Sequence, residues 1–391
     1  MTTNEGKSRM KENYDGILVG AGPAGGMAAR VISKEGHSIL VIDKKKKVGQ
    51  PVQCGEAVSK FALKSNKVRV KKEWVKNSFR GLKIFVPNGK YFFSFVKGYC
   101  IDRTKFDKYI IDQAVHKGCE ILLNTKVMGI KRKNKLWYIR TKRNIFKSKF
   151  LIGADGAESN VATWLGLLKI KDFIKALQYK FRNINIKEKK FLLLYMNSKF
   201  RSGYAWVFPR GDEYNIGVGG VGNIKRWLDD FCRSKNIDVK KKFSVSYGMV
   251  PKRYTLKSFT KDSALIVGDA AGLTNPIFGG GIHSALFSGR LAGKIVCFAL
   301  DSNDPKLISR YDNEVRESPF CNPILQRANK FFYSLNNDEW DFVGEVFENK
   351  NYNDISYLKI FKKFILKPKF LLKVKKFKTL KRAIDMSHGL I

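Results

Sequence analysis

The sequence has no uninterrupted apolar run of the roughly 18–20 residues that a membrane-spanning helix needs. The nearest candidate, residues 285–300, is interrupted by Arg290 and Lys294 and is interpreted as a buried helix. The N-terminal residues 1–13 are polar and lack the apolar centre of a signal peptide, so we do not expect export. The expected location is therefore cytoplasmic, without a membrane span.

The sequence also lacks any cluster of cysteines. The six cysteines are scattered and form no Cys-x-x-Cys pair. We therefore expect neither a zinc site nor a cysteine-bound cluster, and we predict no metal ligand in the chain. A reducing cytosol is the simpler setting for such cysteines. The sequence also contains no internal repeat and no low-complexity linker.

Acidic residues are scarce, with 34 Asp and Glu against 75 Lys and Arg and a formal net charge of +41. Solvated surface lysines explain such an excess without any partner, and the functional alternative is an anionic partner. No nucleic-acid-binding motif is present, so we expect no nucleic acid. An anionic membrane surface fits better, because each basic residue near such a surface gains about 1 kcal/mol.

The most informative stretch is a glycine-rich loop at residues 20–25, which follows a short apolar strand and opens a helix of small residues. Gly20 permits a sharp turn, and Gly22 lets the backbone approach a pyrophosphate. Gly25 lets the helix pack closely on the strand. The helix start, at Ala24, offers unpaired N–H groups to phosphates. The loop predicts a dinucleotide site.

A second apolar strand supports this prediction. Residues 38–42 end at Asp43, which follows the glycine loop by about 20 residues. A carboxylate at this place accepts hydrogen bonds from an adenosine ribose. Strand, glycine loop, helix, strand and acid therefore occur in the order that a dinucleotide-binding unit requires.

A site far downstream indicates which dinucleotide binds. Residues 265–269 form an apolar strand that ends in Gly-Asp, and a glycine run follows at residues 279–281. The carboxylate of Asp269 can hold the ribityl hydroxyls of a flavin. The N–H groups around Gly281 and Ile282, at a helix start, can face the N1/C2 carbonyl edge of the flavin ring. We predict FAD, because NAD alone would need no second Gly-Asp site.

A third turn, Gly-Ala-Asp-Gly at residues 153–156, lies between these two motifs. The three motifs in this order resemble the FAD-dependent oxidoreductases with a glutathione-reductase-like fold of the p-hydroxybenzoate-hydroxylase type. The resemblance implies an α/β FAD domain with an antiparallel-sheet catalytic domain and a helical C-terminal region.

Further segments resemble the geranylgeranyl reductase family. They are Pro-x-x-Cys-Gly-Glu at residues 51–56, Arg-x-x-Phe-Asp at 103–107 and Tyr-x-Trp-x-Phe-Pro at 204–209. Members of this family saturate isoprenoid double bonds in chlorophyll side chains or archaeal membrane lipids. The resemblance covers about residues 14–300. The chain departs from the family pattern at Arg201, where the family has a proline.

The family resemblance implies several further cofactor contacts. Cys54, Gly55 and Ala57 would lie beneath the flavin ring. Arg103 would reach the pyrophosphate or a ribose, and the strand of Val127 would flank the adenine through its backbone.

The resemblance also indicates catalytic and substrate residues, each with a structural alternative. Cys54 would protonate an alkene carbon or shape the pocket. Glu56 is either a second catalytic group or a loop carboxylate. Tyr204 and Trp206 are either hairpin core or the wall of a polyprenyl site, where an aromatic face can stabilise a developing carbocation.

The expected function is FAD-dependent reduction of C=C bonds in geranylgeranyl chains, with an archaeal-type polyprenyl phospholipid such as a digeranylgeranylglycerophospholipid as the substrate. The alternatives are a flavin monooxygenase or halogenase, and a reductase of a chlorophyll or a prenyl diphosphate. The electron donor would be NAD(P)H or a ferredoxin, since a second dinucleotide loop is absent. We expect the protein to act peripherally at the inner face of the cell membrane.

The predicted domains are discontinuous. The FAD domain comprises residues 1–60, 98–165 and 255–300. Residues 61–97 and 166–254 alternate apolar and polar positions, which favours a sheet that roofs the flavin. Residues 301–391 are predicted to be helical. Their lysine-rich apolar segment at about 360–377 either lies on a membrane, caps a lipid tunnel or packs on the catalytic domain.

Overall fold

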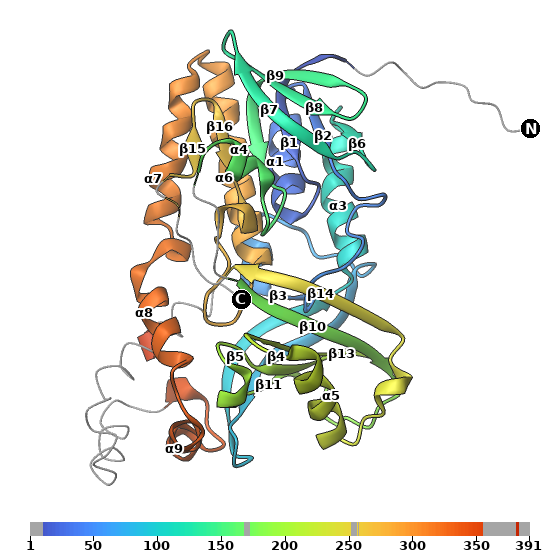
Figure 1. The fold of residues 1–391 in the computed structure, drawn as a ribbon, viewed down its shortest axis with the longest axis vertical. Coiled ribbons are helices and arrows are strands. Elements are labelled where there is room, and N and C mark those ends of the chain that lie inside the picture. Colours follow the sequence, from blue (N-terminus) through green and yellow to red (C-terminus); the bar gives the residue numbers. More distant parts are fainter. Residues whose placement is uncertain (1–10, 168–172, 252–255, 257, 355–380, 383–391) are drawn as a thin grey trace, which may run out of the picture.

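The computed structural model of the chain describes residues 11–167, 173–251, 256, 258–354 and 381–382. Two eight-stranded sheets form the body of this described part. Figure 1 shows one sheet with its helices in the upper half of the molecule and the other sheet in the lower half. Helices α7, α8 and α9 descend along one side and connect the two halves (Figure 1).

The upper sheet has the strand order β15-β16-β9-β1-β2-β6, and β8 and β7 continue from β9 as an antiparallel extension. Its centre is parallel and mainly apolar, as expected where helices cover both faces of a sheet. The strands are β1 (Asn13–Val19), β2 (Ile39–Ile42), β6 (Glu120–Leu122), β7 (Val127–Lys133), β8 (Leu136–Thr141), β9 (Ile145–Gly153), β15 (Thr260–Lys261) and β16 (Ala264–Ile266).

Helices α1 (Pro23–Lys34), α3 (Arg103–Val115), α6 (Ile282–Asp301) and α7 (Ser309–Glu317) pack around this sheet. Helix α1 begins at a proline, whose fixed φ suits the first turn. Helix α3 begins where the Asp102 carboxylate accepts a hydrogen bond from the backbone N–H of Thr104 at 3.0 Å. Small residues let α1 and α6 approach closely, because a Cβ on Gly289 would lie 2.2 Å from the carbonyl oxygen of Ala24.

The lower sheet has the strand order β14-β10-β13-β12-β11-β4-β5-β3. All neighbouring pairs are antiparallel except β11 and β4, which are parallel and come from different predicted insertions. The strands are β3 (Ala57–Ser59), β4 (Val75–Phe85), β5 (Tyr91–Ile101), β10 (Phe173–Arg182), β11 (Phe191–Tyr195), β12 (Ala205–Arg210), β13 (Glu213–Gly220) and β14 (Ser244–Pro251). The short α5 (Ile224–Ser234) covers the outer face of part of this sheet.

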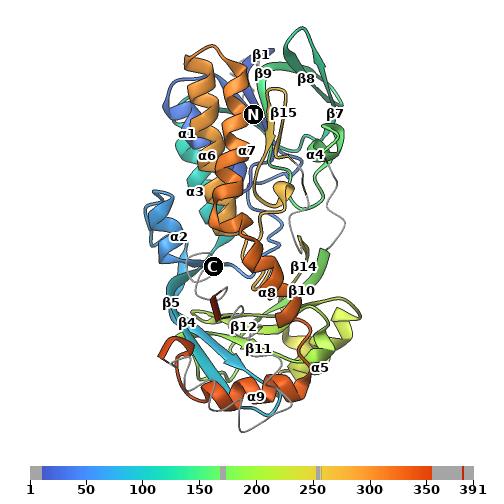
Figure 2. The same cartoon turned by 90° about the vertical axis from the view of Figure 1, so that its left-hand side faces the viewer.

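The remaining helices are α2 (Lys60–Ser65), α4 (Asn160–Trp164), α8 (Pro323–Phe332) and α9 (Asn337–Phe347). Figure 2 shows α2 at the periphery, at the level where the two halves meet, and α9 beneath the lower sheet. No described helix is both long and apolar enough to cross a bilayer. The predicted amphipathic segment at 360–377 lies outside the described residues.

Some elements differ from the predicted division of the chain. One difference is β3, which lies inside the predicted segment 1–60 and yet pairs with β5 of the lower sheet. A second is α2, a helix within a region whose alternating pattern indicates strands. The domain boundaries themselves stay a prediction.

Candidate flavin and substrate site

A cavity of about 540 Å³ lies between the two sheets. It is lined by the glycine loop and the Gly-Asp turn from the upper half and by strands of the lower sheet. All predicted site residues except Gly25 line it: Gly20, Gly22, Ala24, Asp43, Cys54, Gly55, Glu56, Ala57, Arg103, Val127, Tyr204, Trp206, Asp269, Gly281 and Ile282. Motifs that are far apart in the sequence therefore meet at one site.

One end of the cavity is built by the glycine loop and β2. Gly22 precedes α1, and a Cβ added there would meet no atom within 4 Å, so its backbone faces open space. Gly25 is packed beneath the loop, where a Cβ would lie 1.9 Å from the carbonyl oxygen of Gly20. The Asp43 carboxylate, 8% exposed, accepts hydrogen bonds from the N–H groups of Ala21 (2.7 Å) and Lys45 (2.8 Å). It fixes the loop and still borders the cavity.

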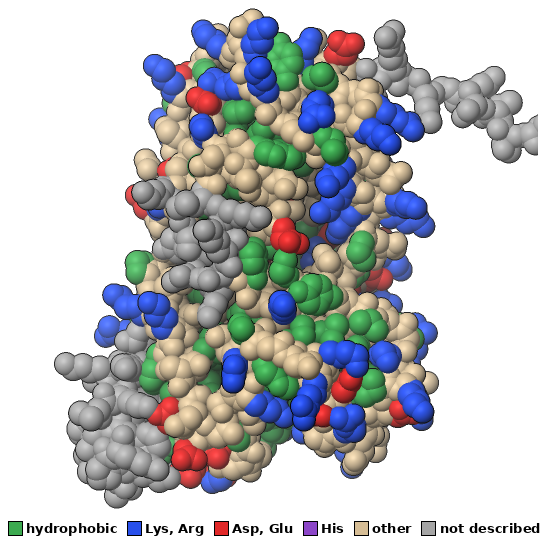
Figure 3. Space-filling model, viewed as in Figure 1, with side chains coloured by type: hydrophobic (Ala, Val, Ile, Leu, Met, Phe, Trp, Pro, Cys, Tyr) green, Lys and Arg blue, Asp and Glu red, His purple; other side chains and the backbone are tan. Residues whose placement is uncertain are grey.

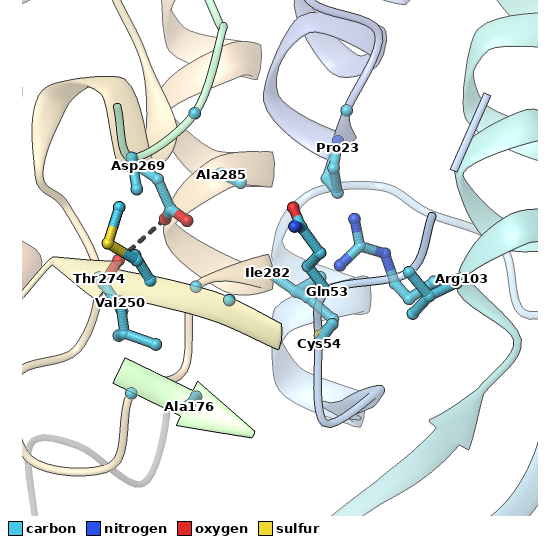
Figure 4. Close-up of a pocket in the computed structure, with 18 of the residues that line it drawn as sticks. Pro23, Gln53, Cys54, Arg103, Ala176, Val250, Asp269, Thr274, Ile282 and Ala285 are labelled. Carbon is cyan, nitrogen blue, oxygen red and sulfur yellow. Dashed lines mark hydrogen bonds between the residues drawn. The ribbon is translucent and has the colours of Figure 1, made fainter. Parts of the chain in front are cut away.

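Asp269 stands at the other end of the cavity. Its carboxylate accepts a hydrogen bond from the Thr274 hydroxyl at 2.8 Å, and Figure 4 shows this pair opposite Arg103 and Cys54. Burial raises the pKa of the Asp269 carboxyl above its ordinary value of 3.8, against the opposing effects of the Thr274 hydrogen bond and the Arg103 charge. Within the described residues no cation forms an ion pair with this buried carboxyl, so it can accept hydrogen bonds from hydroxyl groups.

The turn before the glycine run is fixed by three side chains. The carbonyl oxygens of three consecutive residues each accept one hydrogen bond. The pairs are Asn329 Nδ2 to Pro276 (2.6 Å), Tyr333 hydroxyl to Ile277 (2.6 Å) and Tyr204 hydroxyl to Phe278 (2.5 Å). Two of these donors come from or follow α8, so the C-terminal helices help to shape the loop that carries Gly281.

Arg103 and Cys54 lie together on the opposite wall (Figure 4). The Arg103 guanidinium makes two hydrogen bonds of 2.8 Å to the Asp107 carboxylate. Burial alone would lower the pKa of Arg103, but Asp107 and the Cys54 thiol outweigh it and raise the pKa above its ordinary value. The Cys54 sulfur also accepts from the Glu56 N–H at 3.2 Å. The thiol is therefore adjacent to a permanent cation.

The lower sheet forms the other wall of the cavity. The side chains of residues 204, 206 and 208 share the face of the strand that borders the cavity. The Trp206 indole lies over Gly217 of the paired strand, where an added Cβ would come within 2.2 Å of the ring. The Trp206 N–H donates to the Gln178 side-chain oxygen at 3.0 Å. The other wall residues on β4, β10, β11 and β12 are apolar: Leu82, Ile174, Ala176, Leu192, Leu194 and Phe208. Strand β14 adds the polar side chains of Ser246 and Tyr247.

We call the part of this wall that β4, β10, β11, β12, Tyr204 and Tyr333 form the substrate wall, and this part offers almost no free polar group. The hydroxyls of Tyr204 and Tyr333 and the indole N–H of Trp206 are all bonded to protein acceptors. No charged side chain from the described part of β4, β10, β11 or β12 lines the cavity. Such a surface suits a hydrocarbon chain and offers few groups to which a polar substrate could bond.

Two family models match the chain. The pyridine nucleotide-disulphide oxidoreductase model matches residues 17–192, and the geranylgeranyl reductase catalytic domain model matches residues 172–250. A digeranylgeranylglycerophospholipid reductase of Methanocaldococcus jannaschii is 30% identical over 93% of this chain and 98% of its own length. The enzyme of that name from Methanocella arvoryzae is 34% identical over 79% of this chain and 84% of its own. The chain belongs to the geranylgeranyl reductase family.

Solved structures agree with this membership. A geranylgeranyl bacteriochlorophyll reductase-like protein from Thermoplasma acidophilum superimposes with a TM-score of 0.83 at 29% identity, over 96% of this chain and 99% of that one. A flavin-dependent brominase superimposes with a TM-score of 0.70 over 96% of this chain and 94% of that one, but at 17% identity this likeness concerns the fold alone. The predicted family, fold class and FAD-dependent oxidoreductase class are confirmed.

The site fits FAD. Open space faces the Gly22 backbone at one end, a buried carboxyl at Asp269 faces the cavity at the other, and the cavity connects them. Sequence reasoning missed Gln178, Thr274 and Tyr333. Thr274 lies between the Gly-Asp turn and the glycine run, which is a usable signal, whereas no local pattern distinguishes Gln178 or Tyr333.

Proposed function

We propose that the chain is an FAD-dependent reductase that saturates C=C bonds of geranylgeranyl chains, with a digeranylgeranylglycerophospholipid as its substrate. Membership of the reductase family and the names of its relatives support the reaction. The observation that carries the proposal is the substrate wall, on which the polar atoms of Tyr204, Trp206 and Tyr333 are bonded within the protein. Only an apolar chain can use such a wall fully.

The dinucleotide would be held along the upper half of the cavity. We assign the phosphates to Gly20, Gly22, Ala24 and Arg103, with Gly25 packing the helix against the loop. We assign the adenosine ribose to Asp43 and the adenine to the backbone at Val127. The flavin end would meet Asp269, Gly281 and Ile282 on one side and Cys54, Gly55 and Ala57 on the other.

Reduction of an isolated alkene needs a hydride for one carbon and a proton for the other. Bound FAD, once reduced, supplies the hydride. Cys54 is our candidate proton donor, because it borders the cavity and lies beside the Arg103 guanidinium. Tyr204 and Trp206 would hold the chain and turn their ring faces toward developing positive charge.

A flavin monooxygenase or halogenase is the competing reading of the same fold. The two readings differ in their need for oxygen. We expect the protein, reduced without oxygen, to convert the lipid at least as fast as in air. A rate that falls to background without oxygen would contradict the proposal. Comparing a reduced ferredoxin with NADPH and NADH in this assay identifies the electron donor.

We further propose that the protein works at an anionic membrane surface. Figure 3 shows Lys and Arg over the whole visible face, so net charge alone selects no surface. Helix α2 and the loop after it combine exposed apolar side chains with basic ones: Phe61 is 57% exposed and Val70 is 41% exposed. Exposed cations flank these two side chains: Lys60, Lys64, Lys67, Arg69 and Lys72. None of the five forms an ion pair within the described residues.

Exposed apolar side chains ringed by unpaired cations match the interface of an anionic bilayer, where lysine stems lie along the surface. Helix α2 follows β3 and the Cys54 loop directly, and Leu63 shares a buried cluster with Ile282 of the cavity wall. The surface that we assign to the membrane is thus one layer of side chains away from the flavin end.

Vesicle sedimentation tests this surface. The triple variant Phe61→Ser/Lys64→Glu/Lys67→Glu is expected to lose most binding to anionic vesicles. The charge-matched control Phe95→Ser/Lys240→Glu/Lys241→Glu, made at exposed positions far from α2 in the sequence, is expected to bind like the parent protein. Equal losses in both variants would show that binding follows net charge only. Equal binding of the parent to neutral vesicles would exclude the anionic surface.

A further inference from the structure

The loop that carries Cys54 continues into Glu56, a buried carboxylate to which the proposed cofactor and substrate contacts assign no role. Glu56 is 1% exposed and adopts a positive φ of 64°. Its Oε1 accepts from Arg210 at 3.1 Å and from the Arg103 backbone N–H at 3.3 Å. Its Oε2 contacts the Lys180 ammonium at 2.7 Å and accepts from Asn215 at 3.1 Å. Each oxygen is thus already engaged by two donors.

The cations on Glu56 belong to a buried and nearly balanced network. Arg210 is 2% exposed, donates to the carbonyl oxygen of Ile101 at 3.0 Å and contacts the Glu213 carboxylate at 3.1 Å. Lys180 has a side chain that is 15% exposed. The two carboxylates, Glu56 and Glu213, therefore offset the two enclosed cations. Removing one partner of such a network leaves an uncompensated buried charge.

The backbone of the same loop is also held from the lower sheet. The carbonyl oxygen of Cys54 accepts from the Gln178 side-chain nitrogen at 3.2 Å, and that of Gly55 accepts from Asn215 at 3.0 Å. Gln178 in turn accepts from the Trp206 indole. The side-chain donors to this loop come from β10, β12 and β13 of the lower sheet, which also forms the substrate wall.

We infer that Glu56 is a positioning residue and that Lys180, Arg210, Asn215 and Gln178 form with it a clamp that fixes the Cys54 thiol against the cavity. Glu56 is then not a proton donor. Its charge holds the loop, and Gln178 ties the position of Cys54 to that of the substrate-contacting Trp206. The inference rests on the proposed function only for the role of Cys54 in turnover. The position of the thiol is measurable without substrate.

The test is a charge-compensation experiment on the full chain. Glu56→Gln keeps the shape of the side chain and leaves one enclosed cation unbalanced. Glu56→Gln/Lys180→Met removes that cation as well. Arg182→Met is the matched control, because Arg182 contacts Glu213 at 2.8 Å at the exposed edge of the network and does not touch the loop. The measurements are the alkylation rate of Cys54 by iodoacetamide, the thermal midpoint, and kcat and KM.

A positioning role predicts that Glu56→Gln speeds alkylation of Cys54 by about tenfold, because the loop opens more easily, and lowers kcat. The double variant should return both quantities toward the parent, and the Arg182 control should change neither. An alkylation rate unchanged in Glu56→Gln would overturn the clamp. A double variant that regains the parental alkylation rate and thermal midpoint but stays inactive would make Glu56 the proton donor.

Gln178→Met supplies a second route that leaves every charge in place. It removes the bonds to the Cys54 carbonyl and to the Trp206 indole, and the clamp predicts faster alkylation here too. Because alkylation requires no turnover, inactivity of the parent protein toward the lipid would refute the proposed function and leave the clamp standing. A parental alkylation rate in either Glu56→Gln or Gln178→Met would refute the clamp and leave the function standing.

Discussion

The hydroxyl of Tyr333, just after α8, donates to the carbonyl oxygen of Ile277 at 2.6 Å. This bond joins the C-terminal helices to the turn that leads into the glycine run at the proposed flavin end. Tyr333 also lines the cavity. A side chain on the substrate wall therefore helps to set the loop that would face the cofactor.

Tyr333→Phe should leave the Ile277 carbonyl without its partner, at a cost of about 1–3 kcal/mol in the free energy of unfolding. We also expect weaker retention of FAD, because the glycine run loses an anchor. Chemical denaturation and the FAD dissociation constant measure the two effects. Tyr195→Phe is the control, since Tyr195 stacks on Phe85 and its hydroxyl has no bonding partner within the described residues. Equal effects in both variants would contradict the account.

The six thiols should differ sharply in reactivity. Burial raises the pKa of five of them, Cys100, Cys119, Cys232, Cys297 and Cys321, to about 12, which leaves little thiolate at pH 8. Cys54 is half-buried on the cavity wall. A thiol reagent at pH 8 is expected to modify one thiol quickly, more slowly when FAD is bound, and none quickly in Cys54→Ser. Rapid modification of several thiols in the folded protein would refute this.

Two glycine substitutions should separate cofactor binding from substrate binding. An alanine at Gly22 would meet no protein atom, so Gly22→Ala should fold normally and lose FAD affinity by about tenfold or more, since its methyl occupies the space assigned to the pyrophosphate. An alanine at Gly217 would displace the Trp206 ring, so Gly217→Ala should lose about 1–3 kcal/mol of stability and much of its turnover while it retains FAD. If Gly217→Ala lost FAD affinity, and Gly22→Ala kept FAD but lost turnover, both assignments would be wrong.

FAD affinity should depend on pH through Asp269. Burial raises the pKa of this carboxyl above 3.8, and hydroxyl donors favour its charged form, so binding should release a proton. Affinity is then full above the raised pKa and falls as the pH is lowered through it. Titrations of the apoprotein over this range should show the slope in the parent and a flatter curve in Asp269→Asn. Identical slopes in the parent protein and in Asp269→Asn would show that Asp269 does not take part in FAD binding.

The placement of the glycine loop and of Asp269 on one cavity was predictable, because the proposed cofactor contacts restrict the residue types there. A loop that approaches a phosphate would need glycine at Gly22, and a strand end that accepts hydroxyls would need a carboxylate at Asp269. Both requirements leave a local pattern. The strands of the lower sheet were predictable from their alternation. Helix α5 was missed, although its buried residues Ile224, Leu228, Phe231 and Cys232 recur at helical spacing.

The supporting contacts were not predictable, because they join positions distant in the chain. Arg210 and Glu56 are 154 residues apart, and Tyr333 and Ile277 are 56 apart. Arginine, glutamine and tyrosine also occur at many surface positions, so no local sequence pattern marks these residues as partners in a buried contact. The sequence left Glu56 open between a catalytic group and a loop carboxylate, and only the surroundings of its oxygens distinguish the two.

The most direct test of the account follows the lipid itself. The purified protein is loaded with FAD, reduced without oxygen and incubated with digeranylgeranylglycerophospholipid. The masses of the products are then measured by mass spectrometry. The account predicts that the lipid gains mass in steps of two hydrogens per double bond, and that Trp206→Ala slows this gain while FAD stays bound. A lipid of unchanged mass in the presence of reduced, FAD-loaded protein, or a product that gains oxygen instead, would contradict it.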